Sequence, residues 1–253
     1  MALVIGSAPD AVIAKEWNLS AFTHRVAINN SWQITSNWDY LVYPDDFSPD
    51  RLPSPPLRSN QSFITSNEFV PEQNRLGGFV YAGGTMAFTA AYWTLGALKP
   101  NLLAFLGCDM IYAAGHNESN HFYGHGTSDP LRADITLQSL EAKSARFMSI
   151  ANSLNCAVVN LSELPESRLL FPRASLNDLS DADVADTLLV RQQNSLSETN
   201  IQLALRAEKD LGYMISSGRY WQHLNLLDAT QLKQIDDLWL QAIRPSGQIT
   251  KAI

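Results

Sequence analysis

The opening stretch Ala2-Leu3-Val4-Ile5-Gly6-Ser7-Ala8-Pro9-Asp10 decides the fold class. Its first four residues are apolar and partly β-branched, which is typical of a short strand that is buried on both faces. A glycine turn follows, and the residues from Ala11 to Trp17 can form a helix. A buried strand, a glycine turn and a helix are the usual beginning of an α/β domain.

Further apolar runs predict four more buried strands, and small or polar residues follow each of them. In an open α/β sheet, ligands bind beyond the carboxyl ends of the strands, so we expect a site at these polar ends. The four runs are Val26–Ile28, Tyr40–Tyr43, Leu102–Leu106 and Cys156–Leu161.

The segment Ser48–Arg75 is rich in Pro, Ser and Asn and predicts a surface excursion without a regular helix. One short strand is expected within it, at Ser62–Ser66. The prolines that carry this prediction are Pro49, Pro53, Pro55 and Pro56.

Helical patterns dominate the rest of the chain. Met86–Gly96 is apolar nearly all round and predicts a buried helix. Ala133–Leu154 is amphipathic, and its charged residues Glu141, Lys143 and Arg146 are interpreted as a solvated face. After Asp181 only helices are expected, at Ala182–Gln193, Glu198–Ser216 and Ala229–Ile243, with Tyr220, Trp221 and Trp239 as packing aromatics.

These patterns together predict an α/β protein with a Rossmann-like, mostly parallel sheet flanked by helices and an all-helical C-terminal part. We expect the α/β domain at residues 1–174. A helical extension is expected at residues 175–253.

The composition narrows the function classes. The 253 residues carry a formal net charge of −7, which argues against a general nucleic-acid binder. The two cysteines, Cys108 and Cys156, form no CxxC pair, so neither a disulfide scaffold nor a Cys-rich zinc site is expected. The first residues lack the basic segment of a signal peptide, and we expect a cytoplasmic protein. Peripheral membrane attachment through the tail and a homo-oligomer stay open.

Two glycine turns can each be explained either by phosphate binding or by close packing. Gly6–Pro9 and Gly83–Thr85 can each bring backbone N–H groups close to a phosphate at the beginning of a helix. Close packing between a helix and a strand explains such glycines equally well. Asn29 and Asp45 follow the second and third strands, where they can either contact a base or sugar or simply form turns.

A polar loop contains three histidines, His116, His121 and His125, and the neutral-pH pKa of histidine suits it to act as a general base. The same loop could also hold a metal ion with the help of Asp129, or could be a solvated loop without a catalytic role. Cys108 has no histidine beside it in the sequence and is not predicted to be a nucleophile.

The order of these motifs resembles the bacterial sialyltransferases of glycosyltransferase family 42. The chain is similar, more loosely, to glycosyltransferase-like and pterin-pyrophosphokinase-like proteins that share the opening G-x-x-P turn. The resemblance covers about residues 2–173. It is carried by Val4–Pro9, Val26–Asn29, Leu41–Asp45, Gly83–Thr85, Leu106–Met110 and His121–His125.

The resemblance implies an inverting, metal-independent transferase that moves a sialic-acid-like sugar from a CMP-sugar donor to a hydroxyl of a glycan acceptor, without a cofactor. The second histidine of the family's His-Tyr-x-Gly-His stretch is its general base and matches His125. The family's tyrosine that assists the leaving phosphate matches Tyr112 after a one-residue shift. The implied donor-binding residues are Gly6, Ser7, Ala8, Pro9, Asn29, Asp45, Gly83, Gly84, Thr85, Asp109 and Tyr123.

Two other functions stay open. One is a pyrophosphokinase-like phosphotransferase that uses ATP and Mg²⁺. The other is a non-catalytic module of the same fold that binds a nucleotide or a glycan, since a fold alone does not determine an activity.

Overall fold

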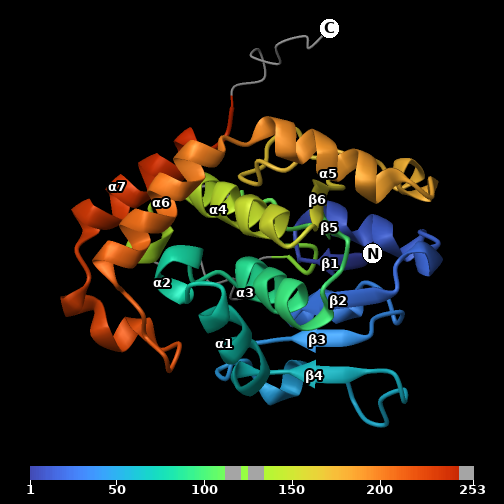
Figure 1. The fold of residues 1–253 in the computed structure, drawn as a ribbon. Coiled ribbons are helices and arrows are strands. Elements are labelled where there is room, and N and C mark those ends of the chain that lie inside the picture. The colour runs from blue at the N-terminus through green and yellow to red at the C-terminus, as the bar shows by residue number, and fades with distance from the viewer. Residues whose placement is uncertain (112–120, 125–133, 245–253) are drawn as a thin grey trace, which may run out of the picture.

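The computed structural model describes residues 1–111, 121–124 and 134–244. Within that part, six parallel strands form one sheet in the order β4-β3-β2-β1-β5-β6 (Figure 1). The predicted α/β class and parallel sheet are confirmed. The strands are β1 (Ala2–Ile5), β2 (His24–Ile28), β3 (Tyr40–Val42), β4 (Ser62–Ile64), β5 (Leu102–Leu106) and β6 (Ala157–Asn160).

The strand order places a topological switch point between β1 and β5. The chain builds the sheet outward from β1 to β4, then crosses back to form β5 on the other side of β1. The 3₁₀ helix η1 (Pro9–Lys15), which follows β1, packs on one face of the sheet, whereas α4 (Leu140–Ser153), which follows β5, packs on the other. Because the two connections diverge, a crevice is expected between the carboxyl ends of β1 and β5.

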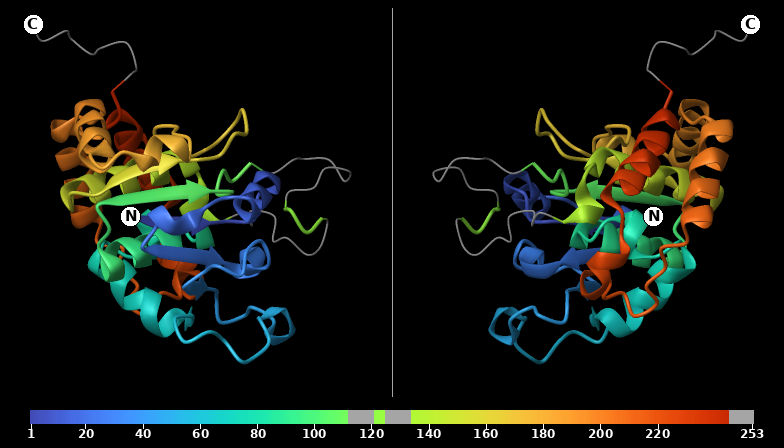
Figure 2. Two further views of the ribbon diagram at one scale, coloured as in Figure 1. Left: turned by 90° about the vertical axis from the view of Figure 1, so that its right-hand side faces the viewer. Right: turned by 90° about the vertical axis from the view of Figure 1, so that its left-hand side faces the viewer.

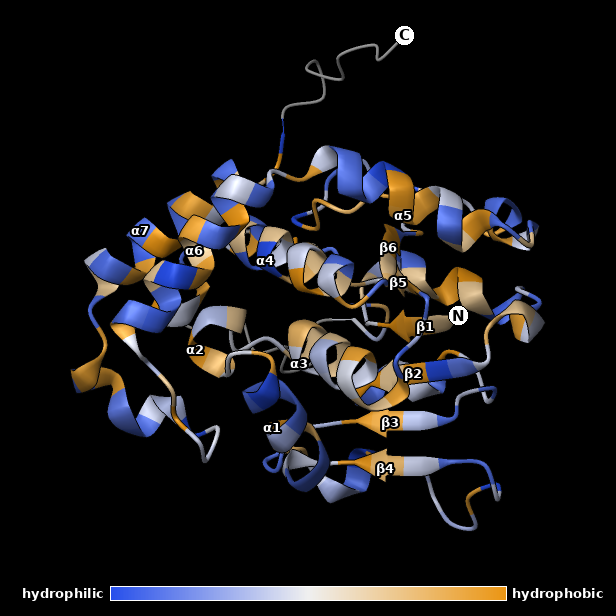
Figure 3. Ribbon diagram, viewed as in Figure 1, coloured by the Kyte–Doolittle hydropathy of each residue, from blue (hydrophilic) through white to orange (hydrophobic). Residues whose placement is uncertain are grey.

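Helices cover both faces of the sheet, and Figure 2 shows this from two further sides. One face carries α1 (Ser66–Arg75), α2 (Phe79–Ala82), α3 (Met86–Trp93) and α4 around the larger hydrophobic core. The other face carries η1 and α5 (Val184–Ser195) around a second core. In Figure 3 the strands are largely apolar, whereas the outer helices alternate apolar and hydrophilic residues.

The remaining short helices connect these elements. A π-helical turn, η5 (Thr94–Leu98), continues α3. The other 3₁₀ helices are η2 (Leu19–Ala21), η3 (Asn29–Gln33), η4 (Pro49–Arg51), η6 (Ile135–Leu137), η7 (Asn177–Ser180) and η8 (Tyr220–Leu226).

The prediction that Ser48–Arg75 contains no regular helix is wrong, because α1 occupies Ser66–Arg75. The prolines that carried the prediction lie upstream of this helix. Thr65 begins it with a capping box, in which the Thr65 amide and hydroxyl both donate to the Glu68 carboxylate at 2.7 and 2.8 Å. Pro71 lies inside α1 and removes only one helical donor.

The last two long helices, α6 (Glu198–Leu211) and α7 (Ala229–Gln241), pack against each other, and α7 packs on α4. α6 ends earlier than the predicted Ser216, because Gly212 adopts a left-handed conformation (φ 69°) that terminates the helix. Residues from both helices belong to the same hydrophobic core as α3 and α4. The division into two domains at residue 174 stays a prediction.

The interpretation of α4's charged residues as a solvated face is wrong for Lys143 and Arg146, which are both 1 % exposed. Lys143 pairs with Asp236 of α7 (Nζ–Oδ1 2.5 Å), and Arg146 pairs with Glu208 of α6 (Nε–Oε1 2.7 Å). The charges are buried because their partners arrive from the C-terminal helices.

The three C-terminal aromatics differ in their surroundings. Trp239 is fully buried and donates from its indole Nε1 to the Glu208 carboxylate at 2.7 Å. Tyr220 is also buried, whereas Trp221 is 58 % exposed. Trp239 and Tyr220 thus have the packing role that the sequence suggests, and the exposed Trp221 packs edge-to-face on the Tyr220 ring, with ring centroids 5.5 Å apart.

Candidate functional site

The candidate site is the carboxyl edge of the sheet at the switch point. In the left view of Figure 2, β5 points to the right, and the loops that follow the strands emerge on that side. The register aligns Ile5 of β1 with Leu106 of β5 and with Ala27 of β2. The turn after β1, Gly6–Pro9, and the loop after β5, Gly107–Met110, therefore begin at the same level.

These two loops are in direct backbone contact. The Gly6 amide donates to the Leu106 carbonyl at 2.8 Å, and the Ala8 amide donates to the Gly107 carbonyl at 3.0 Å. A Cβ atom on Gly6 would lie 2.2 Å from the Gly107 carbonyl oxygen, so only glycine allows this approach. Since Pro9 has no N–H, a ligand at this turn can meet the Ser7 amide and the Ser7 hydroxyl.

Residues 121–124 of the histidine loop lie against the first turn. The Ser7 hydroxyl and the His121 Nδ1 atom are 2.7 Å apart, and the Phe122 amide donates to the Ser7 carbonyl at 3.0 Å. The His121 ring stacks on Tyr123, with ring centroids 5.0 Å apart and nearly parallel planes. Two motifs that are 114 residues apart in the sequence thus form one surface.

Burial lowers the pKa of His121 below its usual 6.5, and a contact with the Ser7 backbone offsets part of this effect. The ring is therefore neutral at pH 7, which leaves it able to accept a proton or a hydrogen bond. Which of its nitrogens carries the proton depends on whether Ser7 donates or accepts.

Two aspartates are linked beneath this surface. The Ser162 hydroxyl donates to Asp10 Oδ2 at 2.7 Å, and the Ser162 amide donates to Asn160 Oδ1 at 3.0 Å. The Asn160 side chain in turn donates to Asp109 Oδ1 at 3.0 Å. This chain of hydrogen bonds joins the carboxyl ends of β1, β5 and β6.

One oxygen of each carboxylate is left open. Asp10 Oδ1 and Asp109 Oδ2 are buried and accept no hydrogen bond from the described residues. Asp109 is 1 % exposed. Burial raises the pKa of Asp10, the hydrogen bond from Ser162 lowers it, and the negative charge of Asp109 raises it further. Such open acceptors in a buried position suit a ligand that brings hydroxyl or amino donors.

Cys108 follows β5, close to Gly6 of the turn after β1, and is 3 % exposed. Burial, with added repulsion from Asp109 and Asp10, raises the pKa of its thiol far above the usual value. Because the thiolate is the nucleophilic form, burial disfavours a nucleophilic role for Cys108 at neutral pH.

Two non-glycine residues at this edge have left-handed backbones, Asn29 after β2 (φ 51°) and Met110 after β5 (φ 55°). Asn tolerates this conformation, whereas it is strained for Met. The Asn29 carboxamide oxygen is buried and accepts no hydrogen bond from the described residues. Strain and an open acceptor therefore occur together at the candidate site.

The turn Gly83–Thr85 also reaches this edge. The Thr85 hydroxyl lies 3.7 Å from the Met110 sulfur and accepts the Phe88 amide at 3.3 Å, which caps α3. The space beside Gly84 is filled, because a Cβ there would lie 1.9 Å from the Tyr220 hydroxyl. Packing thus explains this glycine, and a role for the turn in donor binding stays a prediction.

The other predicted residues do not join this group. Asp45 is exposed beyond β3, and no hydrogen bond among the described residues links it to the site. His125 and Tyr112, the predicted catalytic residues, lie outside the described residues, as do His116 and Asp129. Within the described ranges, no group of three or more His, Cys, Asp or Glu residues could hold a metal ion.

Sequence reasoning missed Asp10, Asn160 and Ser162. Asp10 directly follows the quoted turn, and Asn160 and Ser162 end the last strand, so their position after strands was visible. What the sequence did not contain was the strand order, which brings the end of β6 beside that of β5.

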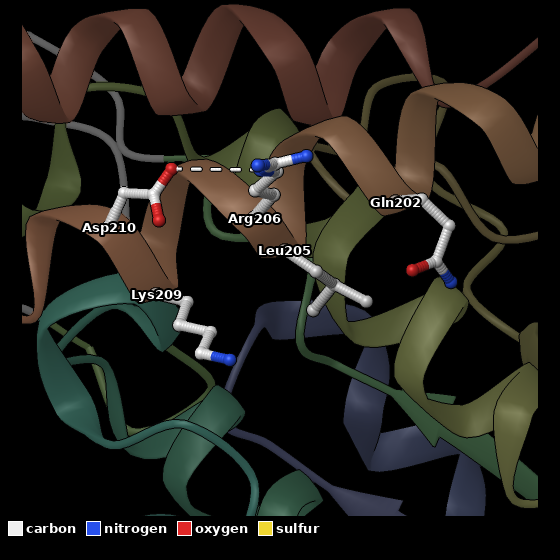
Figure 4. Close-up of a pocket in the computed structure, with 5 residues that line it drawn as sticks. All are labelled: Gln202, Leu205, Arg206, Lys209 and Asp210. Carbon is white, nitrogen blue, oxygen red and sulfur yellow. Dashed lines mark ion pairs between the residues drawn. The ribbon is translucent and has the colours of Figure 1, made fainter.

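An open hollow elsewhere on the molecule lies on α6 and is lined by residues of that helix alone (Figure 4). Its Arg206–Asp210 ion pair spans 3.9 Å between largely exposed side chains. A single exposed helix face provides no buried polar group, so this hollow is not a candidate site. The residues that line the hollow are Gln202, Leu205, Arg206, Lys209 and Asp210.

Comparisons with protein-family models, with curated proteins and with solved structures found no match. The resemblance to glycosyltransferase family 42 therefore rests on the motifs quoted above. None of the helices in the described ranges combines the length and apolar character needed to cross a membrane.

Proposed function

We propose that this protein is a glycosyltransferase that binds a nucleotide-activated sugar at the carboxyl edge between β1 and β5. The observation that carries the proposal is the contact between Ser7 and His121, at 2.7 Å. It joins the turn that the resemblance assigns to the donor nucleotide with the loop that the resemblance assigns to the catalytic base.

The charges at this edge favour an orientation of the donor. The open oxygens of Asp10 and Asp109 would repel a phosphate and attract hydroxyl or amino groups. We therefore place the ribose or the cytosine amino group near Asp109. We place the phosphate at the turn after β1, near the Ser7 amide.

The proposed reaction is an inverting transfer. The acceptor hydroxyl gives its proton to a general base as its oxygen forms a bond to the anomeric carbon, and the bond from that carbon to the phosphate oxygen breaks to release CMP. His125 is the proposed base and Tyr112 the proposed donor to the leaving phosphate. His121 lies on the donor turn through Ser7 and is proposed to orient this loop.

The test is release of CMP from a CMP-sialic acid in the presence of a panel of oligosaccharide acceptors, with EDTA present. We expect turnover by the wild-type protein. Since one well-placed group is worth about 10²–10³ in rate, His125→Ala should lower turnover at least that much while leaving CMP binding intact. His24→Ala, at the amino end of β2, is the matched control. Normal turnover by His125→Ala would remove His125 from the mechanism.

The aspartate pair supports a second candidate, the ATP-dependent phosphotransferase. Carboxylate oxygens are the ligands that Mg²⁺ prefers, and Asp10 and Asp109 each have an open one. This candidate predicts stabilisation by ATP only in the presence of Mg²⁺, with loss of the effect in Asp109→Asn. Ligand binding without turnover of any donor and acceptor would instead support the non-catalytic module.

A further inference from the structure

The connection between α6 and α7, residues 212–228, runs along the outside of α1 and α2 and is called the strap below (Figure 1). The Asn74 side chain donates to the Ser216 carbonyl at 2.7 Å, which fastens the strap to α1. The Tyr213 amide donates to the Tyr81 hydroxyl at 2.8 Å, which fastens it to α2. The strap is thus fixed along its length before it reaches Tyr220.

The side chain of Tyr220 packs against the turn Gly83–Thr85. Its side chain is 5 % exposed, and its hydroxyl occupies the space that a Cβ on Gly84 would enter, at 1.9 Å. Its ring carbon Cζ would lie 2.8 Å from the same Cβ. Tyr220 and Gly84 are therefore matched in shape, and a larger residue in place of Gly84 requires Tyr220 to move.

A relay of hydrogen bonds joins the same two residues from the other side. The Tyr220 hydroxyl donates to Asp134 Oδ2 at 2.5 Å, and Asp134 Oδ1 accepts the Thr136 hydroxyl at 2.7 Å. The Thr136 oxygen in turn accepts the Gly84 amide at 3.3 Å. The Gly84 backbone is thus held between the ring of Tyr220 and a chain of hydrogen bonds that runs through Thr136 and Asp134 to the Tyr220 hydroxyl.

The turn that Tyr220 holds reaches the edge of the candidate site. Its Thr85 caps α3 and lies 3.7 Å from Met110, the strained residue that follows Asp109. We propose that Tyr220 is a positioning residue: it fixes the turn Gly83–Thr85 so that Thr85 and the β5 loop present one ligand-binding geometry. This inference rests on the proposed function, because it assigns to the strap the preorganisation of the same site.

The test compares Tyr220→Phe with Tyr213→Phe. Each variant removes one phenol hydroxyl from the strap. The Tyr213 hydroxyl accepts the Asp228 amide at 3.1 Å, and no hydrogen bond among the described residues joins it to the turn. Two quantities are measured: hydrogen exchange of the amides of residues 83–88, and the Kd of CMP by calorimetry.

For Tyr220→Phe we expect faster exchange of residues 83–88 and a Kd about 2- to 10-fold higher, the range that one hydrogen bond supports. Tyr213→Phe should change neither. If Tyr220→Phe folds poorly, Gly84→Ala tests the same contact from the side of the turn. It should give the same faster exchange and higher Kd.

Wild-type exchange and wild-type Kd in a folded Tyr220→Phe would overturn the inference. Failure of the proposed function gives a different result, namely that the wild-type protein binds no CMP at all. In that case the exchange of residues 83–88 alone decides whether Tyr220 holds the turn.

Discussion

The hydroxyl of Ser7 and the Nδ1 atom of His121 lie 2.7 Å apart, although 114 residues separate them in the sequence. This contact holds His121 on the turn that follows β1. It also makes the protonation state of His121 relevant to the geometry of the candidate site, because the ring is half-buried and its pKa is lowered.

The first prediction concerns the stability of the protein against pH. Because the folded pKa of His121 lies below the unfolded value of 6.5, the unfolded chain binds more protons in the interval between them. The contribution of His121 to stability is thus fully present above about pH 6.5 and is lost as the pH falls through the folded pKa. In thermal melts between pH 8 and 5, His121→Gln should show a shallower loss of Tm than the wild-type protein.

His24→Gln is the control for this experiment, since His24 lies at the amino end of β2. Identical pH profiles for His121→Gln and the wild-type protein would show that the neutral ring contributes nothing to folding.

The second prediction concerns Asp10, whose pKa is raised chiefly by burial. For a carboxyl group with a raised pKa, stability is present below the unfolded value of about 3.9 and is lost as the pH rises through the folded pKa. Ionised Asp10 therefore destabilises the protein at pH 7.5. Asp10→Asn keeps an oxygen for the Ser162 hydroxyl and removes the charge, so its Tm at pH 7.5 should exceed that of the wild-type protein.

The gain in Tm should amount to about 2–4 °C for each kcal/mol added to the free energy of unfolding, and it should shrink toward pH 4. Asp46→Asn, at an exposed carboxylate beyond β3, tests whether any loss of negative charge gives the same gain. A lower Tm for Asp10→Asn at pH 7.5 would mean that the charge is paired in the folded protein. A stabilising replacement at Asp10 is typical of a residue kept for function.

The third prediction concerns the buried Arg146, which joins α4 to α6 and α3. Its guanidinium donates to both Glu208 oxygens, at 2.7 and 2.9 Å, and to the Tyr92 hydroxyl at 2.5 Å. Arg146→Met leaves the Glu208 carboxylate buried without its cation, which should lower the free energy of unfolding by about 3–5 kcal/mol. Urea denaturation measures this loss.

Two further variants test the cause of that loss. Adding Glu208→Gln to Arg146→Met removes the orphaned charge and keeps an acceptor for the Trp239 indole, so part of the stability should return. Arg206→Ala breaks a largely exposed ion pair on α6 and should change the free energy of unfolding by less than about 1 kcal/mol. Equal losses from Arg146→Met and Arg206→Ala would contradict the role of burial.

The strands were the most predictable part of the fold, because short apolar runs such as Ala2–Ile5 can only be buried. The sequence also pointed to the ends of these strands, including Asn29 and Asp109. The strand order cannot be read from the sequence, so the chain of hydrogen bonds from Asp10 through Ser162 to Asp109 could not be predicted.

The charged residues of α4 show the same limit. Lys143 and Arg146 fit a solvated face when the helix is considered alone, since their partners lie 93 and 62 residues further along the chain. Helix α1 escapes prediction for a different reason: Pro49, Pro53, Pro55 and Pro56 all precede it and do not affect the residues from Ser66 to Arg75.

The most direct test of the nucleotide site is a thermal-shift measurement with CMP in EDTA, beside ATP with and without Mg²⁺. A ligand at about 100 times its Kd adds roughly 2.7 kcal/mol, which corresponds to about 5–10 °C in a chain of this size. We predict that CMP raises the Tm by this amount without a metal, and that Asp109→Asn loses the shift while Asp210→Asn keeps it. No shift with CMP, together with a shift by ATP that requires Mg²⁺, would contradict the CMP-sugar transferase and favour the phosphotransferase.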